Sequence, residues 1–75
     1  MTLPTINMAA TGSNITHLRK KAGLTVKNIQ AVMGLNNPQA IYAWQRGQAL
    51  PTIDNLVVLA AILNVKIDDI IVRTN

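Results

Sequence analysis

The stretch LTVKNIQAVMGLNNPQAIYAWQRG, residues 24–47, decides the fold of this chain. Apolar side chains recur in it at the three- and four-residue spacing of an α-helix, on both sides of a short polar turn. They are Val26, Ile29 and Met33 before the turn, and Ala40, Ile41 and Trp44 after it. Each set lines one face of a helix, so the stretch predicts two amphipathic helices that share a core.

Local signals mark where these two helices begin and end. Thr25 is a favoured N-cap for the first helix, and Gly34 ends it because glycine tolerates the left-handed conformation. Asn37 and Pro38 open the second helix, since asparagine caps well and proline fits the first helical position. Gly47 closes that helix, which therefore spans about residues 37–46. Two short helices around a tight turn are typical of a helix-turn-helix, whose second helix enters the major groove of DNA.

Upstream of this stretch, residues 1–12 mix Thr, Asn, Pro and Gly without a sustained period, which predicts a flexible N-terminal arm. A first helix is expected to start at Ser13 or Asn14, either of which can cap it, and to end at Gly23. The inward face of this helix is expected at Ile15, Leu18 and Ala22.

Downstream, two further helices complete the predicted fold. Thr52 caps the first of them, whose apolar run over residues 56–63 fits a buried strand or a helix by its period alone. The cap, the adjacent alanines and the length of the segment before Asn64 favour a helix. Because this helix is apolar nearly all round, we expect other parts of the protein to pack against both of its sides. A short fifth helix follows over about residues 67–72. The chain is therefore predicted to be all-α, with five helices over residues 13–75 and no strand.

Charge is divided unevenly along the chain. The 75 residues carry a net charge of +4, with five basic and no acidic side chains in residues 1–53 and two basic against three acidic ones in residues 54–75. A single-signed half on so small a domain attracts a polyanion such as nucleic acid. A merely solvated basic face has the same composition, so charge alone does not decide between the two.

Composition also narrows the classes of function. Cysteine is absent, which excludes a disulfide framework and a thiolate metal site. Ser13 and His17 are the only serine and histidine and the three acids are scattered, so neither a catalytic nucleophile nor a metal site is expected. The longest apolar run has eight residues, far short of the roughly 20 in a membrane span, and we expect no secretory signal because residues 1–10 lack a basic region followed by an apolar stretch. We therefore expect a cytoplasmic, non-enzymatic protein without cofactor or small-molecule effector.

The pattern as a whole resembles the phage repressor and Cro-type (XRE-like) helix-turn-helix family over about residues 14–72. The residues that carry the resemblance are Leu18-Arg19, Gly23-Leu24-Thr25, Gly34-Leu35, Ile41-Tyr-Ala-Trp44-Gln-Arg-Gly47, Pro51-Thr52, Leu56 and Leu59-Ala60. The aromatic-x-Arg-Gly sequence followed by a proline and an apolar helix is the most specific part. The resemblance implies a lambda-repressor-like domain that acts on double-stranded DNA as a sequence-specific transcription regulator of the small repressor type.

The chain departs from the family's usual pattern in several places. Val26 stands where a glutamine usually supports a phosphate, and Gln30 stands where alanine is usual. The turn at residues 35–38 is one residue longer than the common form, which shifts which side chain meets which base. Arg19 and Gln45 stand where many members pair an arginine with a glutamate. Gln45 can accept one hydrogen bond from Arg19; in the alternative, Arg19 faces solvent or DNA.

The outward face of the helix at residues 37–46 carries the side chains expected to read bases. Gln39 can bind adenine bidentately, and Ala43 can touch a thymine methyl group. Tyr42 can reach a base or a sugar-phosphate, or it can simply cover the junction between the two helices. Asn37 can read a base, although its preference for the cap competes with that role. Trp44 is expected in the core rather than stacked on bases.

A second set of residues is suited to phosphates, because cations and helix N-termini bind anions without reading sequence. The set consists of Thr25, Val26, Lys27, Arg46 and Gln48, with Thr25 and Val26 acting through their backbone N–H groups. Lys20 and Lys21 either contact phosphates or form a solvated face.

The apolar residues of the last two helices predict a further partner. A surplus at Val58, Ile62, Ile67, Ile70, Ile71 and Val72 favours a homodimer, with DNA half-sites about 34 Å apart. The alternative function is an antitoxin-like or adaptor module that binds another protein through this same surface. RNA binding has less support, because one Tyr and one Trp offer few aromatic side chains for stacking.

Overall fold

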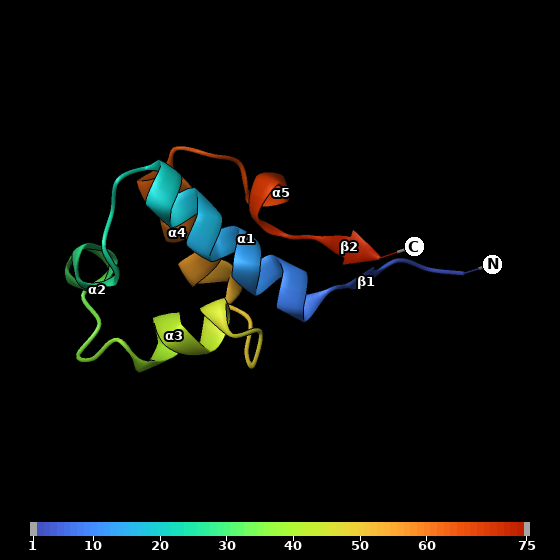
Figure 1. Ribbon diagram of the computed structural model, residues 1–75, viewed down its shortest axis with the longest axis horizontal. Helices are drawn as coiled ribbons and strands as arrows, with labels where there is room; N and C mark the ends of the chain where they lie inside the picture. Colours follow the sequence, from blue (N-terminus) through green and yellow to red (C-terminus); the bar gives the residue numbers. More distant parts are fainter. Residues whose placement is uncertain (1, 75) are drawn as a thin grey trace.

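A computed structural model describes residues 2–74 as five α-helices and one pair of short strands (Figure 1). The elements in chain order are β1 (Thr5–Ile6), α1 (Met8–Lys21), α2 (Val26–Met33), α3 (Gln39–Gln45), α4 (Ile53–Leu63), α5 (Ile67–Ile70) and β2 (Arg73–Thr74). In Figure 1, α1 runs through the middle of the molecule. α2 lies near one end of α1, α3 lies below it, and the strands project from the other end. The five helices confirm the predicted fold class, whereas the strand pair corrects the expectation of no strand.

One apolar core draws side chains from all five helices. Its members are Ile15, Ile29, Ile41, Trp44, Leu56, Leu59, Ala60, Leu63 and Ile70. Ile15, Ile29 and Ile41 are completely buried and come from α1, α2 and α3 in turn. Burial of one such side chain contributes about 1.5–3 kcal/mol. The two helices of the helix-turn-helix are therefore held against α1 and α4 by their apolar faces.

The capping signals of α2 and α4 work as predicted. Thr25 and Asn28 form a capping box: the Asn28 N–H donates to Thr25 Oγ1 over 3.0 Å, and the Thr25 N–H donates to Asn28 Oδ1 over 2.9 Å. Thr52 Oγ1 accepts a hydrogen bond from the first turn of α4. Gly34 and Asn64 end these helices in the left-handed conformation, with φ of 70° and 57°.

α1 begins at Met8, so the predicted start at Ser13 or Asn14 is wrong. Asn7 is the N-cap, and its Oδ1 accepts a hydrogen bond from the Ala10 N–H over 2.9 Å. The segment assigned to a flexible arm over residues 1–12 therefore includes the first turn of a helix and, before it, a paired strand.

Gly12, the last residue of the predicted arm, lies inside α1, and the carboxyl end of α3 crosses close to it there. A Cβ atom at residue 12 would lie 2.6 Å from the carbonyl oxygen of Gln45, and it would also meet the carbonyl of Trp44. Only a residue without a side chain allows this approach of two backbones. Gly12 thus sets the distance between α1 and the carboxyl end of α3.

The C-terminal segment is bound to the first half of α1. The Val72 N–H donates to Thr11 Oγ1 over 2.9 Å, and the Asn7 N–H donates to the Val72 carbonyl over 2.8 Å. The Asn14 side-chain amide donates to the carbonyls of Asp69 and Ile70 over 2.7 and 2.9 Å. The chain is already extended at Ile71, with ψ of 127°, and Val72 bonds to residues 7 and 11, so α5 ends at Ile70 and not at Val72 as predicted.

Past this segment the two ends of the chain pair as antiparallel strands. Thr5 lies opposite Thr74 and Ile6 opposite Arg73 in the register of β1 and β2. The hydroxyls of Thr5 and Thr74 also share a hydrogen bond of 2.7 Å. Each strand has two residues, too short to show a period in the sequence.

α4 is covered on one side only, contrary to the prediction. Ile53, Val57 and Val58 are 73%, 54% and 40% exposed. Among the residues predicted to be surplus, Ile70 is completely buried in the core, and Ile62, Ile67 and Ile71 pack against it. Among the last two helices, the exposed large apolar side chains therefore lie on α4.

Candidate nucleic-acid interface

α3 presents one face to the core and the other to solvent, as a reading helix must. Ile41 is completely buried and Trp44 is 4% exposed, so Trp44 lies in the core as predicted. Gln39 is exposed, and Tyr42 is 40% exposed. The two longest side chains of the predicted reading set are thus free to meet a ligand.

The first turn of α3 lies further from the core than the sequence period indicated. Ala40, expected to point inward, is exposed, and Ala43, expected to point outward, is half-buried. α3 meets α1 at its carboxyl end, where Gly12 faces the backbone of Gln45, so the amino end projects away. Ala40 therefore belongs to the outward face, and sequence reasoning missed it because it stands one turn before Trp44.

The N-cap of α3 is Pro38, without a side-chain cap, so the prediction of Asn37 as N-cap and Pro38 as first helical residue is wrong; Asn37 forms a local turn just before the helix. Its Oδ1 accepts a hydrogen bond from the Gln39 N–H over 3.0 Å. The helix itself starts at Gln39, after Pro38, rather than at residue 37 as predicted. The side chain of Asn37 is exposed, so a contact between its amide and a base stays a prediction.

Arg19 ties α1 to the end of α3 and to the link before α2. Its Nε donates to Gln45 Oε1 over 2.9 Å, and its Nη1 donates to the Leu24 carbonyl over 2.8 Å. Of the two alternatives for Arg19, the structure has the pairing with Gln45. Hydrogen bonds to a charged group contribute about 1.5–3 kcal/mol. Because Gln45 is neutral, the pair fixes α3 without reducing the positive charge of this half of the chain.

The amino end of α2 offers two backbone N–H groups to an anion. The capping box engages the N–H groups of Thr25 and Asn28, whereas the first turn of a helix gives those of Val26 and Lys27 no acceptor of its own. The Thr25 N–H, predicted to contact a phosphate, is thus already bonded within the capping box, and the N–H groups left open belong to Val26 and Lys27. Val26 packs its side chain against the core, so it contributes its backbone only, while the Lys27 side chain is exposed.

A second cationic group lies at the other end of the motif. Arg46 Nε donates to Gln48 Oε1 over 3.1 Å, and both side chains are exposed. The contact orients the guanidinium through Nε and leaves its two terminal nitrogens available to donate to an acceptor such as a phosphate.

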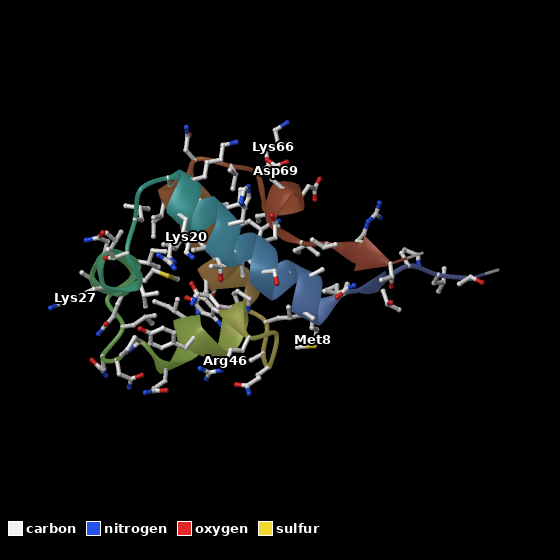
Figure 2. The ribbon with its side chains drawn as sticks, in the orientation of Figure 1. Met8, Lys20, Lys27, Arg46, Lys66 and Asp69 are labelled. Atoms are coloured by element: carbon white, nitrogen blue, oxygen red, sulfur yellow. The ribbon has the colours of Figure 1, made fainter. Side chains whose placement is uncertain are left out.

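The charged side chains are separated in space as they are in sequence. Figure 2 shows Lys27 beyond α2 and Arg46 below α3, whereas Lys66 and Asp69 lie by α5 on the opposite side of the molecule. Lys27 and Arg46 thus lie beside the helix-turn-helix, and Asp69 lies away from it. Lys20 and Lys21 are also exposed, and their contact with phosphates stays a prediction.

Two other kinds of feature are absent from residues 2–74. This part of the chain has no helix that is both long and apolar enough to cross a membrane. It also holds no group of three or more His, Cys, Asp or Glu side chains placed to bind a metal ion.

Known proteins share this arrangement. A family model described as helix-turn-helix matches residues 15–70. The fold is similar to that of the crystal structure of the restriction-modification controller protein C.AhdI from Aeromonas hydrophila, with a TM-score of 0.76. The two chains are 22% identical, and the similarity covers 85% of this chain and 96% of that one. No curated protein sequence matches the chain.

Proposed function

The chain belongs to the helix-turn-helix family of sequence-specific DNA-binding transcription regulators, and we propose that it reads an operator with α3 in the major groove. One observation carries the proposal. The outward face of α3 is free, and it lies between the open N–H groups of α2 and the guanidinium of Arg46. A helix held in this way enters the groove while its neighbours grip the backbone on either side.

The proposal gives each group one of two roles. Gln39 and Tyr42 contact base edges, with Ala40 close to the same bases and with Ala43 and Asn37 at the margin. Lys27, Arg46, Gln48 and the N–H groups of Val26 and Lys27 contact phosphates. Phosphate contacts fix the position of the helix and base contacts carry the sequence preference.

A selection of bound sequences from random DNA, followed by a salt titration, tests the function. We expect one motif to be enriched, and log K to fall with log salt at a slope near −5 if about six phosphates are neutralised. Failure to enrich a motif, together with a flat salt response, would favour the protein-interaction alternative.

We further propose that the regulator is a homodimer joined through the exposed stripe of α4. Ile53, Val57 and Val58 present apolar surface there, and exposed apolar patches mark contact sites. The 75-residue chain also gains from a partner, since small domains bury a low fraction of their surface alone. Val57→Lys is expected to shift the sedimentation coefficient to that of a monomer. Val32→Lys is the matched control, because Val32 is a valine of α2, outside the proposed interface, that is 67% exposed.

We assign the chain no catalytic reaction and place its action in the cytoplasm. Membership of a regulator family supports the first assignment. Incubation of the pure protein with its selected DNA is expected to leave the DNA chemically intact, and cleavage or modification would contradict it.

A further inference from the structure

Gln30 takes part neither in the core nor in the DNA contacts proposed above, yet it lies beside the turn that leads to α3. Its side chain is half-buried, and its Nε2 donates a hydrogen bond of 3.3 Å to the Leu35 carbonyl. The Leu35 N–H in turn donates to the Gln30 carbonyl over 3.0 Å. The side chain of Gln30 therefore bonds to the carbonyl of Leu35, and the Gln30 backbone carbonyl bonds to the Leu35 N–H.

The path of the turn explains why Leu35 needs such a partner. Gly34 reverses the chain in the left-handed conformation, and the Leu35 side chain then packs against the core. This packing leaves the Leu35 carbonyl partly buried over α2, where a backbone acceptor without a donor is unfavourable. Alanine at position 30 has no donor to offer, whereas the amide of glutamine has two.

We propose that Gln30 is a positioning residue, which braces the turn at residues 34–38 and thereby sets the angle at which α3 enters the groove. The proposal rests on the DNA-reading function proposed above. The contact between Gln30 and Leu35 also links two departures from the usual pattern of the family. One is the glutamine within α2, and the other is the longer turn that begins at Leu35.

The brace acts on the amino end of α3, where the reading residues lie. Between Leu35 and the start of α3, the turn is held by one local side-chain contact, the hydrogen bond from the Gln39 N–H to Asn37 Oδ1. The carboxyl end of α3 is fixed separately, by Arg19 and Gln45. α3 is therefore held at both ends by side-chain amides, and loss of the first one frees the end that carries Gln39.

Gln30→Met tests the brace, because methionine keeps the length of the side chain and removes the donor. The affinity of the variant is measured for the best selected site and for each single base-pair change in it. A mismatch ordinarily costs about 5- to 150-fold in affinity. We expect this discrimination to fall at least about threefold at the positions under Gln39, with the salt slope of non-specific binding unchanged. Val32→Ala, exposed on the same helix, is the matched control and is expected to keep the wild-type profile.

Amide hydrogen exchange gives an independent measure that does not depend on DNA. In Gln30→Met, the N–H groups of Leu35 and Gln39 are expected to exchange several-fold faster than in the wild type, while those of α4 are unchanged. Gln30→Glu, which also lacks the donor, is expected to give the same pattern and serves if the methionine variant does not fold.

Unchanged discrimination together with unchanged exchange at the turn overturns the proposal. Faster exchange with unchanged discrimination overturns the positioning role and leaves Gln30 a structural residue. If the wild type itself selects no motif, the proposed function has failed, and the exchange data still decide whether Gln30 braces the turn.

Discussion

Replacing Gly12 by alanine tests how closely α1 and α3 approach each other. In an ordinary helix interior this change stabilises a protein by about 1 kcal/mol, because alanine is the better helix former. In this chain the new Cβ would lie 2.6 Å from the carbonyl oxygen of Gln45 and 2.9 Å from its carbonyl carbon. Both are backbone atoms, which cannot rotate out of the way. We therefore expect the sign to reverse, with a net loss of about 1–3 kcal/mol from overpacking.

Thermal and urea unfolding measure this effect directly. In a domain of this size each kcal/mol shifts Tm by roughly 4–8 °C, so Gly12→Ala is expected to lower Tm by about 4–24 °C. Ser13→Ala is the matched control, since Ser13 is the next residue of α1 and is exposed. It is expected to raise stability by about 0.5 kcal/mol through helix propensity alone. A rise in Tm for Gly12→Ala similar to that of the control would refute the close crossing of the two helices.

Three further substitutions test the site and the closure of the chain. Gln39→Ala is expected to weaken binding to the selected site by about 1–3 kcal/mol and to relax the preference at one base position, as measured by fluorescence anisotropy. Arg46→Ala is expected to weaken binding to all sequences alike and to reduce the salt slope by about one unit. Thr11→Val removes the acceptor of the Val72 N–H and is expected to lower the free energy of unfolding by about 1–3 kcal/mol in urea titrations.

Each of these substitutions has an outcome that contradicts its assignment. An unchanged base preference in Gln39→Ala would mean that α3 lies in the groove in another register. A base-specific loss in Arg46→Ala would move that residue from the phosphate set to the reading set. Unchanged stability in Thr11→Val would show that the C-terminal segment contributes nothing to holding α1.

The parts of the fold that the sequence predicts are those that depend on short-range signals. Thr25, Thr52 and Gly34 act at helix ends through atoms within a few residues, so their roles follow from residue type and position. The buried face of α2 follows from the helical period in the same way. Ile29 is an example, since it is predicted to be inward and is completely buried.

The parts that the sequence does not predict depend on contacts between distant segments. Val72 bonds to Thr11 across 61 residues, and this contact decides both the end of α5 and the strand pair. The need for a glycine at position 12 inside α1 likewise depends on the crossing of α3, which residue type alone does not indicate. The start of α1 is a different case: Asn7 caps it locally, but the residues up to Gly12 show no sustained helical period that would mark the helix.

In the candidate site, too, short-range signals predict some positions, whereas contacts between distant segments decide the others. The outward positions of Gln39 and Tyr42 follow from the period, but Ala40 and Ala43 exchange their expected faces because α3 tilts away from α1. The pairing of Arg19 with Gln45 was one of two alternatives that the resemblance suggested, and only the geometry chose between them. The contact from Gln30 to Leu35 had no local signal beyond the unusual residue itself.

The central claim is that α3 reads bases from the major groove, and chemically modified operators test it most directly. Replacing purines of the selected site by their 7-deaza forms removes a major-groove acceptor, whereas replacing guanine by inosine removes only the minor-groove amino group. We predict that at least one 7-deaza substitution under α3 costs about 1–3 kcal/mol in affinity, and that this loss disappears in Gln39→Ala. Losses confined to the inosine substitutions, with every 7-deaza site bound normally, would contradict the account.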